Sequence, residues 1–169
     1  ELDPLESGVI SITMMHGGGA YNVIPPSMEL QGTIRSLTLD GLRHLQSRVK
    51  AVAEGIAQAN QCEVEVSFPG NDYPPTLNDE QSWDAGKSAM EEVLGTGKVM
   101  EMPPVMGGED FAYYTQRVPG CFAFLGVGNP DIGATYSVHH PMFKVDEDAL
   151  PYGSAIHVNC ALKTLDELR

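Results

Sequence analysis

Two adjacent histidines, His139 and His140, precede a proline in the stretch YSVHHPMF and are the strongest candidates for chemistry in the sequence. Neutral imidazole is a common ligand for zinc, manganese and related ions, and a neighbouring proline would make such a loop rigid. A metal site needs about three or four ligands, but neither HxxxH, HxH nor CxxC spacing occurs among the 169 residues. Taken alone, the pair is therefore more typical of an exposed loop than of a metal site.

Other candidate side chains also have two interpretations. Glu109 and Asp110 follow the glycines of MGGEDF, where they either start a helix or lie in a ligand-binding loop, Gly108 giving a ligand close access to the backbone. Asn22 lies in GGGAYNVIPP and is either a turn residue or a site residue. Arg35 is one of only 10 basic residues against 23 acidic ones, so it either binds a substrate carboxylate or forms a surface ion pair.

The first part of the chain has the periodicity of an α+β layer. Residues 9–15 and 28–36 alternate between apolar and polar side chains, which predicts two half-buried strands separated by a loop rich in glycine and proline. Apolar residues then recur every three or four positions from Leu42 to Ile56, which predicts an amphipathic helix. CEVEVSF, residues 62–68, alternates again and predicts a third strand. This order resembles an α+β layer that lacks its opening strand and helix.

A segment rich in proline and glycine near residue 75 predicts the boundary between two substructures, 1–75 and 76–169. After it, Asn78 with Gln81 predicts the N-cap of a helix that runs to Leu94 and stops at Gly95. GGEDFAYYTQRVPG predicts a short helix, and CFAFLGVG, residues 121–128, predicts a buried strand. Asp146 is expected to begin the final helix.

Composition excludes several classes of partner. The formal net charge of −13 leaves no basic surface for nucleic acid or anionic lipid. No apolar run of about 18 residues is present, and the cysteines are three and widely spaced. We therefore expect a soluble cytoplasmic protein that binds neither nucleic acid nor membranes.

Five motifs occur in order over nearly the whole chain: GGGAYNVIPPSMELQGTIRS, YPPTLND, MGGEDFAYY, VPGCFAFLGVGNP and HHPMFKVDEDALPYGSAIHV. Together they resemble the C-terminal half of one family of dinuclear metal-dependent amidohydrolases and peptidases. That family includes N-acyl-L-amino acid amidohydrolases (aminoacylases), hippurate hydrolases and indole-3-acetic acid amino acid conjugate hydrolases.

The resemblance implies two domains and a division between them. Residues 1–75 would be the C-terminal part of a βαββαβ lid or dimerisation domain. Residues 76–169 would be the C-terminal part of an α/β metallopeptidase catalytic domain. It also implies that the intact enzyme is a homodimer through the lid, and that this chain is a fragment whose N-terminal remainder precedes Glu1.

The same resemblance implies the site residues. His139 matches the last ligand to one of two divalent ions, whether zinc, manganese, cobalt or nickel, and the other ligands and the general-base glutamate are expected upstream of Glu1. Asn22 and Arg35 match lid residues that face the substrate's amide oxygen and carboxylate, in this subunit's site or in that of a partner subunit. Gly108 and Glu109 match a loop that lines the substrate pocket.

The implied reaction is hydrolysis of the amide bond of N-acyl amino acids by metal-activated water. The 169-residue chain alone is then expected to be inactive. Two alternatives stay open: a non-catalytic truncated homologue that acts as a dimerisation module, and a dipeptidase or carboxypeptidase of the same family.

Overall fold

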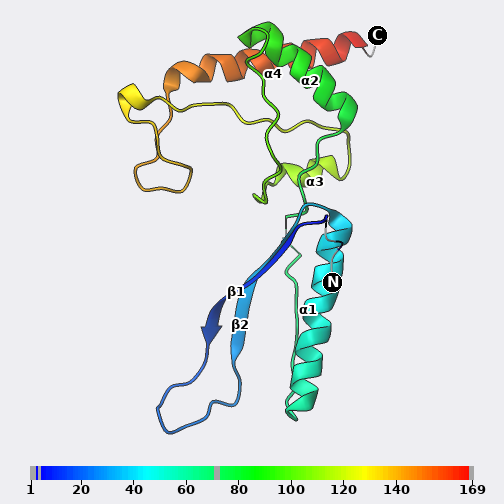
Figure 1. The fold of residues 1–169 in the computed structure, drawn as a ribbon, viewed down its shortest axis with the longest axis vertical. Coiled ribbons are helices and arrows are strands. Elements are labelled where there is room, and N and C mark those ends of the chain that lie inside the picture. The colour runs from blue at the N-terminus through cyan, green and yellow to red at the C-terminus, as the bar shows by residue number, and fades with distance from the viewer. Residues whose placement is uncertain (1–2, 4, 71–72, 168–169) are drawn as a thin grey trace. The chain divides into compact units, whose positions relative to one another are not determined.

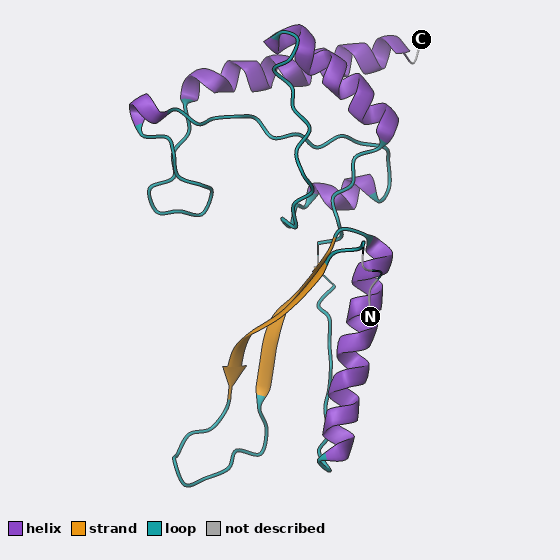
Figure 2. Cartoon of the chain, viewed as in Figure 1, coloured by secondary structure: helices purple, strands orange, loops and turns teal. Residues whose placement is uncertain are grey.

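The computed structural model describes residue 3, residues 5–70 and residues 73–167. The chain forms two compact units, which are described separately below (Figure 1). The first contains residues 1–76 and 103–113, and the second contains residues 77–102 and 114–169. Helices, strands and the long irregular segments that join them are distinguished in Figure 2.

The first unit is built on an antiparallel β-hairpin. Strand β1, Gly8–His16, pairs with β2, Glu29–Ser36, and the pairing irregularity between Ile12 and Met14 is a local disruption of the ladder. The positions of both predicted strands are confirmed, but the predicted buried face is not: Ile10, Ile12 and Leu30 are 44%, 58% and 61% exposed. At Gly32 the two backbones approach so closely that a Cβ atom would lie 2.1 Å from the carbonyl oxygen of Ser11, so glycine is required there.

Helix α1, Leu39–Ala59, confirms the predicted helix and packs along the hairpin. It begins at Thr38, whose hydroxyl accepts a hydrogen bond of 3.0 Å from the backbone N–H of Gly41. Leu42 and Leu45 are buried at its N-terminal end, whereas Ile56 near the other end stays 62% exposed. The apolar stripe of α1 is thus covered only over its first turns.

The predicted strand at residues 62–68 is wrong. The segment leaves α1 as an extended chain, and β1 and β2 are the only strands that pair in a sheet among the described residues. Alternating apolar side chains are a necessary feature of a half-buried strand, but the backbone also needs a neighbouring strand for its hydrogen bonds. None of the described residues supplies that neighbour.

Helices α2, Glu80–Leu94, and α4, Leu150–Glu167, pack against each other in the second unit. The predicted span of α2 and its stop at Gly95 are confirmed, but the predicted cap is wrong. Asp79 is the N-cap, and its carboxylate accepts from the N–H of Ser82 at 2.9 Å. This hydrogen bond lowers the pKa of Asp79, because the interaction favours the ionised form.

Asn78 has a different role, which also explains a second wrong prediction. Residues 121–128 form no strand, and the backbone of Phe122 is held by the side chain of Asn78. The amide of Asn78 accepts from Phe122 N–H at 2.8 Å and donates to Phe122 C=O at 3.0 Å. One side chain thus makes the two hydrogen bonds that a strand neighbour would make.

Three short elements complete the fold: α3 at Phe111–Thr115, and the 3₁₀ turns η1 at Pro130–Ile132 and η2 at Glu147–Ala149. The predicted short helix is confirmed by α3. Asp146 caps η2, which continues directly into α4, so the predicted start of the final helix is confirmed with a 3₁₀ first turn.

Few apolar side chains are buried in either unit. Among the described residues the buried apolar ones are Leu42, Leu45, Ala89, Met90, Ala112 and Ala134. Many large apolar side chains of the hairpin and of α4 remain exposed, including Ile12 at 58% and Leu162 at 56%. No helix in the described ranges is long and apolar enough to cross a membrane.

Candidate functional site: a closed loop that carries the histidine pair

Residues 129–146, here called the histidine loop, carry both adjacent histidines in the second unit (Figure 1). Its two ends are joined by the side-chain amide of Asn129, which donates to Asp146 Oδ2 at 2.7 Å. The N–H of Asp146 also donates to the carbonyl of Val127 at 2.9 Å. These hydrogen bonds therefore hold the two ends of the histidine loop together.

The interior of the loop has hydrogen bonds of its own. Asn129 and Ala134 exchange two backbone hydrogen bonds, both of 2.9 Å, around the turn η1. Further along, His140 N–H donates to Ser137 C=O at 3.2 Å, and Phe143 N–H donates to His140 C=O at 2.9 Å. These bonds form successive tight turns, so the backbone around the histidine pair is fixed although no helix or strand contains it.

The two histidines have different environments. The ring of His140 stacks on Tyr136 with centroids 4.3 Å apart, and its Nδ1 accepts the N–H of Met142 at 3.0 Å. In a neutral imidazole, an accepting Nδ1 puts the proton on Nε2, so neither nitrogen keeps a free lone pair for a metal. The His139 ring is exposed and makes no hydrogen bond within the part of the chain that the structure describes.

His139 also has an unusual backbone, with φ at 68° in the left-handed region. This conformation costs a non-glycine residue about 1 kcal/mol or more and persists only where the surroundings impose it. The His139 imidazole is thus exposed and makes no contact like the stack of His140 on Tyr136.

One imidazole does not make a metal site. No group of three or more histidine, cysteine, aspartate or glutamate side chains that could hold an ion occurs within residues 3, 5–70 and 73–167. His139 fits the role of a single nitrogen ligand, since it is exposed and its ring nitrogens are unoccupied. The rest of a coordination sphere would have to come from outside the described residues.

All four predicted substrate residues, Asn22, Arg35, Gly108 and Glu109, lie in the first unit. The structure brings Arg35 close to the segment that contains Gly108 and Glu109. Arg35 on β2 donates from Nη1 to the carbonyl of Met106 at 2.5 Å, which fixes the guanidinium beside the glycine segment that contains Gly108 and Glu109. Gly108 lies against the ring of Tyr73, where an added Cβ would be 3.3 Å from Cδ2. Glu109 is half-buried, and its carbonyl accepts the N–H of Ala112 at the start of α3.

Asn22 is not close to these residues along the hairpin. It lies in the loop that joins β1 to β2, beyond the last paired residues His16 and Glu29, whereas Arg35 pairs with Val9 at the other end of the hairpin. The rise of a strand puts Glu29 and Arg35 roughly 20 Å apart. Asn22 is exposed and makes no hydrogen bond within the described chain.

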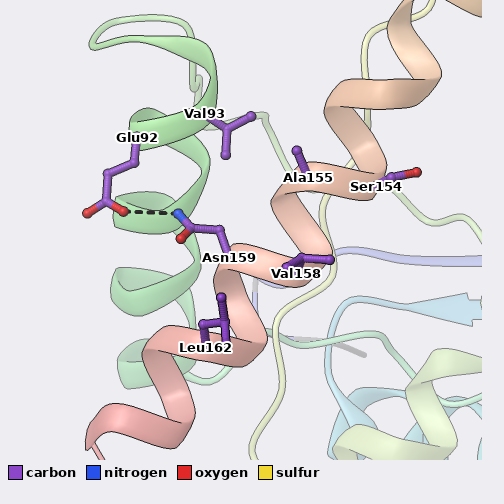
Figure 3. A pocket seen from close by; sticks show the side chains of 7 residues that line it. All are labelled: Glu92, Val93, Ser154, Ala155, Val158, Asn159 and Leu162. Atoms are coloured by element: carbon purple, nitrogen blue, oxygen red, sulfur yellow. Dashed lines mark hydrogen bonds between the residues drawn. The ribbon is translucent and has the colours of Figure 1, made fainter.

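The second unit also contains a groove between α2 and α4, with a volume of about 620 Å³. Figure 3 shows Asn159 on α4 donating to Glu92 on α2, at 3.0 Å. This bond and the contact with Lys163 lower the pKa of Glu92. The groove is lined by Glu92, Val93, Ser154, Ala155, Val158, Asn159 and Leu162. None of the residues that the sequence indicated for chemistry is among them.

The sequence reasoning missed the side-chain pair that closes the histidine loop. Asp146 was assigned only to the final helix, and Asn129 received no role. Two local signals point to them: Asn129 precedes a proline, which favours an Asx turn, and Asp146 precedes two acidic residues at a helix start. Neither signal reveals that the two side chains meet, because 17 positions separate them.

The chain has a mixed α/β fold, and its histidine loop carries His139 with an exposed imidazole that makes no hydrogen bond within the described residues. The sequence model of the peptidase family M20/M25/M40 matches residues 5–163. The chain belongs to this family, which confirms the resemblance seen in the five motifs.

Two curated relatives and one solved structure illustrate the match. An IAA-amino acid hydrolase of Arabidopsis thaliana is 38% identical over 172 residues, covering 100% of this chain and 39% of the relative. Thermostable carboxypeptidase 2 of Saccharolobus solfataricus is 36% identical over 163 residues, covering 96% of this chain and 41% of the relative.

The crystal structure of the Bacillus subtilis YxeP protein, described as a dinuclear metal-binding peptidase of the M20 family, has a TM-score of 0.78 with this chain. The two are 33% identical, and the match covers 94% of this chain and 42% of the other. The chain thus spans about two fifths of the length of the proteins that it matches.

Proposed function

We propose that this chain is the C-terminal part of a metal-dependent amidohydrolase that cleaves the amide bond of N-acyl amino acids or similar conjugates. The observation that carries the proposal is the 38% identity, over the whole chain, to an IAA-amino acid hydrolase. The geometry of the histidine loop supports it, since one histidine of the pair is available as a ligand and the other is not.

His139 is the proposed ligand to one of two divalent ions, the remaining ligands and the general-base glutamate being supplied by the rest of the enzyme. When bound, such ions activate water and polarise the amide carbonyl. His139 would supply one imidazole nitrogen, from a residue whose backbone is held in the left-handed region.

Arg35 is the proposed anchor for the carboxylate of the amino acid. Its Nη1 is bonded to the carbonyl of Met106, which orders the side chain, and guanidinium has further donors in a fixed planar fork. Gly108 and Glu109 follow Met106 closely in the chain. We therefore propose that they line the substrate pocket beside Arg35.

Asn22 is proposed to act in a site completed by a second copy of the chain. Asn22 and Arg35 lie at opposite ends of one hairpin, too far apart for both to touch one small substrate. The exposed apolar side chains of the hairpin, such as Ile12 and Leu30, support a homodimer that covers them. We propose the cytoplasm as its compartment, because three widely spaced cysteines indicate no disulfide framework.

The test compares two neighbouring substitutions in the full-length enzyme. His139→Ala should remove one ion per chain and lower turnover of an N-acyl amino acid by at least about 100-fold, since ligand loss exceeds the effect of losing an outer-shell partner. His140→Ala is the matched control: it removes an imidazole that is not a proposed ligand, so both ions still bind at saturating metal, although the loss of the Tyr136 and Met142 contacts weakens their affinity. Ion content is measured by mass spectrometry of the metal, and turnover by release of the free amino acid. Full metal content and full turnover in His139→Ala would contradict the proposal.

A second candidate activity is peptide hydrolysis, favoured by the 36% identity to a carboxypeptidase. A panel of N-acetyl, N-benzoyl and indole-3-acetyl amino acids assayed beside dipeptides and longer peptides separates the two. If peptides are cleaved in preference, the enzyme is a peptidase, and His139 and Arg35 keep the roles proposed above. A metal-free dimer that cleaves neither class would favour the non-catalytic dimerisation module.

A further inference from the structure

The closure of the histidine loop uses every side-chain polar atom of the pair that forms it. Asn129 Oδ1 accepts the N–H of Asp131 at 3.0 Å while its Nδ2 donates to Asp146 Oδ2. Asp146 Oδ1 accepts the N–H of Asp148 at 3.1 Å. Because each side chain is bonded at both ends, neither can rotate without losing a hydrogen bond.

The closure is connected to His139 through the tight turns inside the loop. The backbone pair between Asn129 and Ala134 fixes the first turn, in which Gly133 has a φ of 70° and Ala134 is only 3% exposed. The stack of Tyr136 on His140 and the bond from Met142 to His140 then fix the second turn, at whose start His139 is held in its left-handed conformation. Such a conformation needs a surrounding structure that imposes it.

We propose that Asn129 and Asp146 are positioning residues that close the histidine loop and thereby fix the direction of the His139 imidazole toward its metal ion. This inference rests on the proposed function, because it takes His139 as a ligand. Neither residue touches the ion. Residues that orient a ligand in this way typically change metal affinity about 10- to 100-fold when they are mutated.

The pair allows a test by exchange of the two side chains. In Asn129→Asp, two carboxylates face each other at the contact that is now 2.7 Å, so the closure should open. In Asp146→Asn, two amides face each other and one hydrogen bond is lost. In the double variant N129D/D146N, the amide at position 146 donates to the carboxylate at position 129. Both outer oxygens still accept the N–H groups of Asp131 and Asp148, and the net charge is unchanged.

The experiment uses the full-length enzyme with Asn129→Asp, Asp146→Asn, the double variant, and Asn78→Ala as control. Asn78 makes two hydrogen bonds to the backbone of Phe122 in the same unit, away from the histidine loop. Three quantities are measured: the dissociation constant of the metal ion, the exchange rates of the Ala134 and Met142 amides in the metal-free enzyme, and Tm. The control sets the loss of metal affinity that a comparable loss of Tm produces by itself.

We expect Asn129→Asp to weaken metal binding at least tenfold and to accelerate exchange at Ala134 and Met142. The double variant should return both quantities to within about threefold of the wild type, because the exchanged pair makes the same hydrogen bonds. A merely structural role predicts instead that Asn129→Asp loses no more affinity than Asn78→Ala does at a comparable loss of Tm. Wild-type affinity and exchange in Asn129→Asp, or no rescue in a folded double variant, would overturn the proposal. Should the double variant not fold, equal loss of affinity in Asn129→Ala and Asn78→Ala at matched Tm would overturn it.

The two proposals fail in different ways. If His139 is not a ligand, His139→Ala keeps its metal while Asn129→Asp still accelerates amide exchange in the loop. If His139 is a ligand but the pair does not position it, His139→Ala loses an ion while Asn129→Asp binds metal as the wild type does.

Discussion

The loop at residues 17–28 and the histidine loop at 129–146 each carry a candidate site residue, and their internal structures differ. In the first, here called the hairpin loop, the N–H of Val23 donates to the carbonyl of Ala20 at 3.3 Å, and this long bond is its backbone hydrogen bond outside the strand ladder among the described residues. Tyr21 and Ile24 are fully or almost fully exposed there. The histidine loop has paired backbone bonds, a ring stack and a side-chain closure.

The difference extends to the backbone. The residues with positive φ in the hairpin loop are glycines, Gly17 and Gly18, which adopt these conformations without a Cβ penalty. In the histidine loop, His139 takes a left-handed conformation despite its side chain. Strain at a non-glycine residue is tolerated because the closed loop imposes it. The histidine loop thus holds His139 in one backbone conformation, whereas the hairpin loop makes few contacts that could hold Asn22.

The largest contrast is expected in amide hydrogen exchange of the purified protein. The amides of Ala134, Phe143 and Asp146 each donate to a backbone carbonyl of the second unit, so they exchange only when the histidine loop opens. They should exchange at least about 100-fold more slowly than the amides of Gly18 to Asn22, measured by mass spectrometry after proteolysis or by NMR. Equal rates in the two loops would remove the basis of the comparison.

A substitution in the hairpin loop tests its backbone separately. Gly18 has a φ of 81°, and an added Cβ would meet no atom within 4 Å. Gly18→Ala should therefore lower the free energy of unfolding by about 1 kcal/mol through conformation alone, because no contact is lost. Chemical denaturation measures this change.

Gly19 is the matched control for that substitution. A Cβ there also meets nothing within 4 Å, and its φ is not in the left-handed region. Gly19→Ala should be neutral or stabilise by up to about 1 kcal/mol, since alanine restricts the unfolded chain. A loss of stability as large as that of Gly18→Ala would show that the hairpin loop makes contacts beyond its glycine geometry.

Elements that depend on residues close together in the sequence could be predicted from it, whereas elements that depend on contacts between distant residues could not. The strands β1 and β2 and the helix α1 follow from alternation and helical period within short windows, and all three are confirmed. Residues 62–68 show the same alternation, and residues 121–128 are a continuous apolar run with glycine. Neither segment is a strand, because pairing depends on a neighbour that their own residues do not contain. Asn78 was misassigned for a similar reason, since its partner Phe122 lies 44 positions away.

The candidate site divides in the same way. His139 could be singled out by its motif, and the structure adds why it differs from His140, through a stack and an Nδ1 contact that are set three-dimensionally. The hydrogen bond from Arg35 to Met106 joins residues 71 positions apart. The sequence alone therefore leaves Arg35 with two possible roles, a substrate anchor or a surface ion pair. Local signals located Asp146 but not its contact with Asn129.

The smallest expected effect is the difference in stability between glycine and alanine variants, which reports the backbone strain at His139. This difference should have opposite signs at His139 and His140. At an ordinary position, glycine is less stable than alanine by about 0.5–1 kcal/mol, because it has more freedom in the unfolded chain. In the left-handed region alanine carries a steric penalty of about 1–2 kcal/mol that glycine does not. His139→Gly should therefore unfold at a higher free energy than His139→Ala, by about 0.5 kcal/mol after the two contributions are combined.

At His140, which is not in the left-handed region, the order should reverse, with His140→Ala more stable than His140→Gly by about 0.5–1 kcal/mol. Both substitutions at each position remove the same ring, so each difference reports the backbone alone. The four variants are compared by denaturant unfolding without metal, which separates strain from ligand loss. If alanine is the more stable residue at both positions, the closed loop does not hold His139 in a strained conformation, and its rigidity comes from the His140 contacts alone.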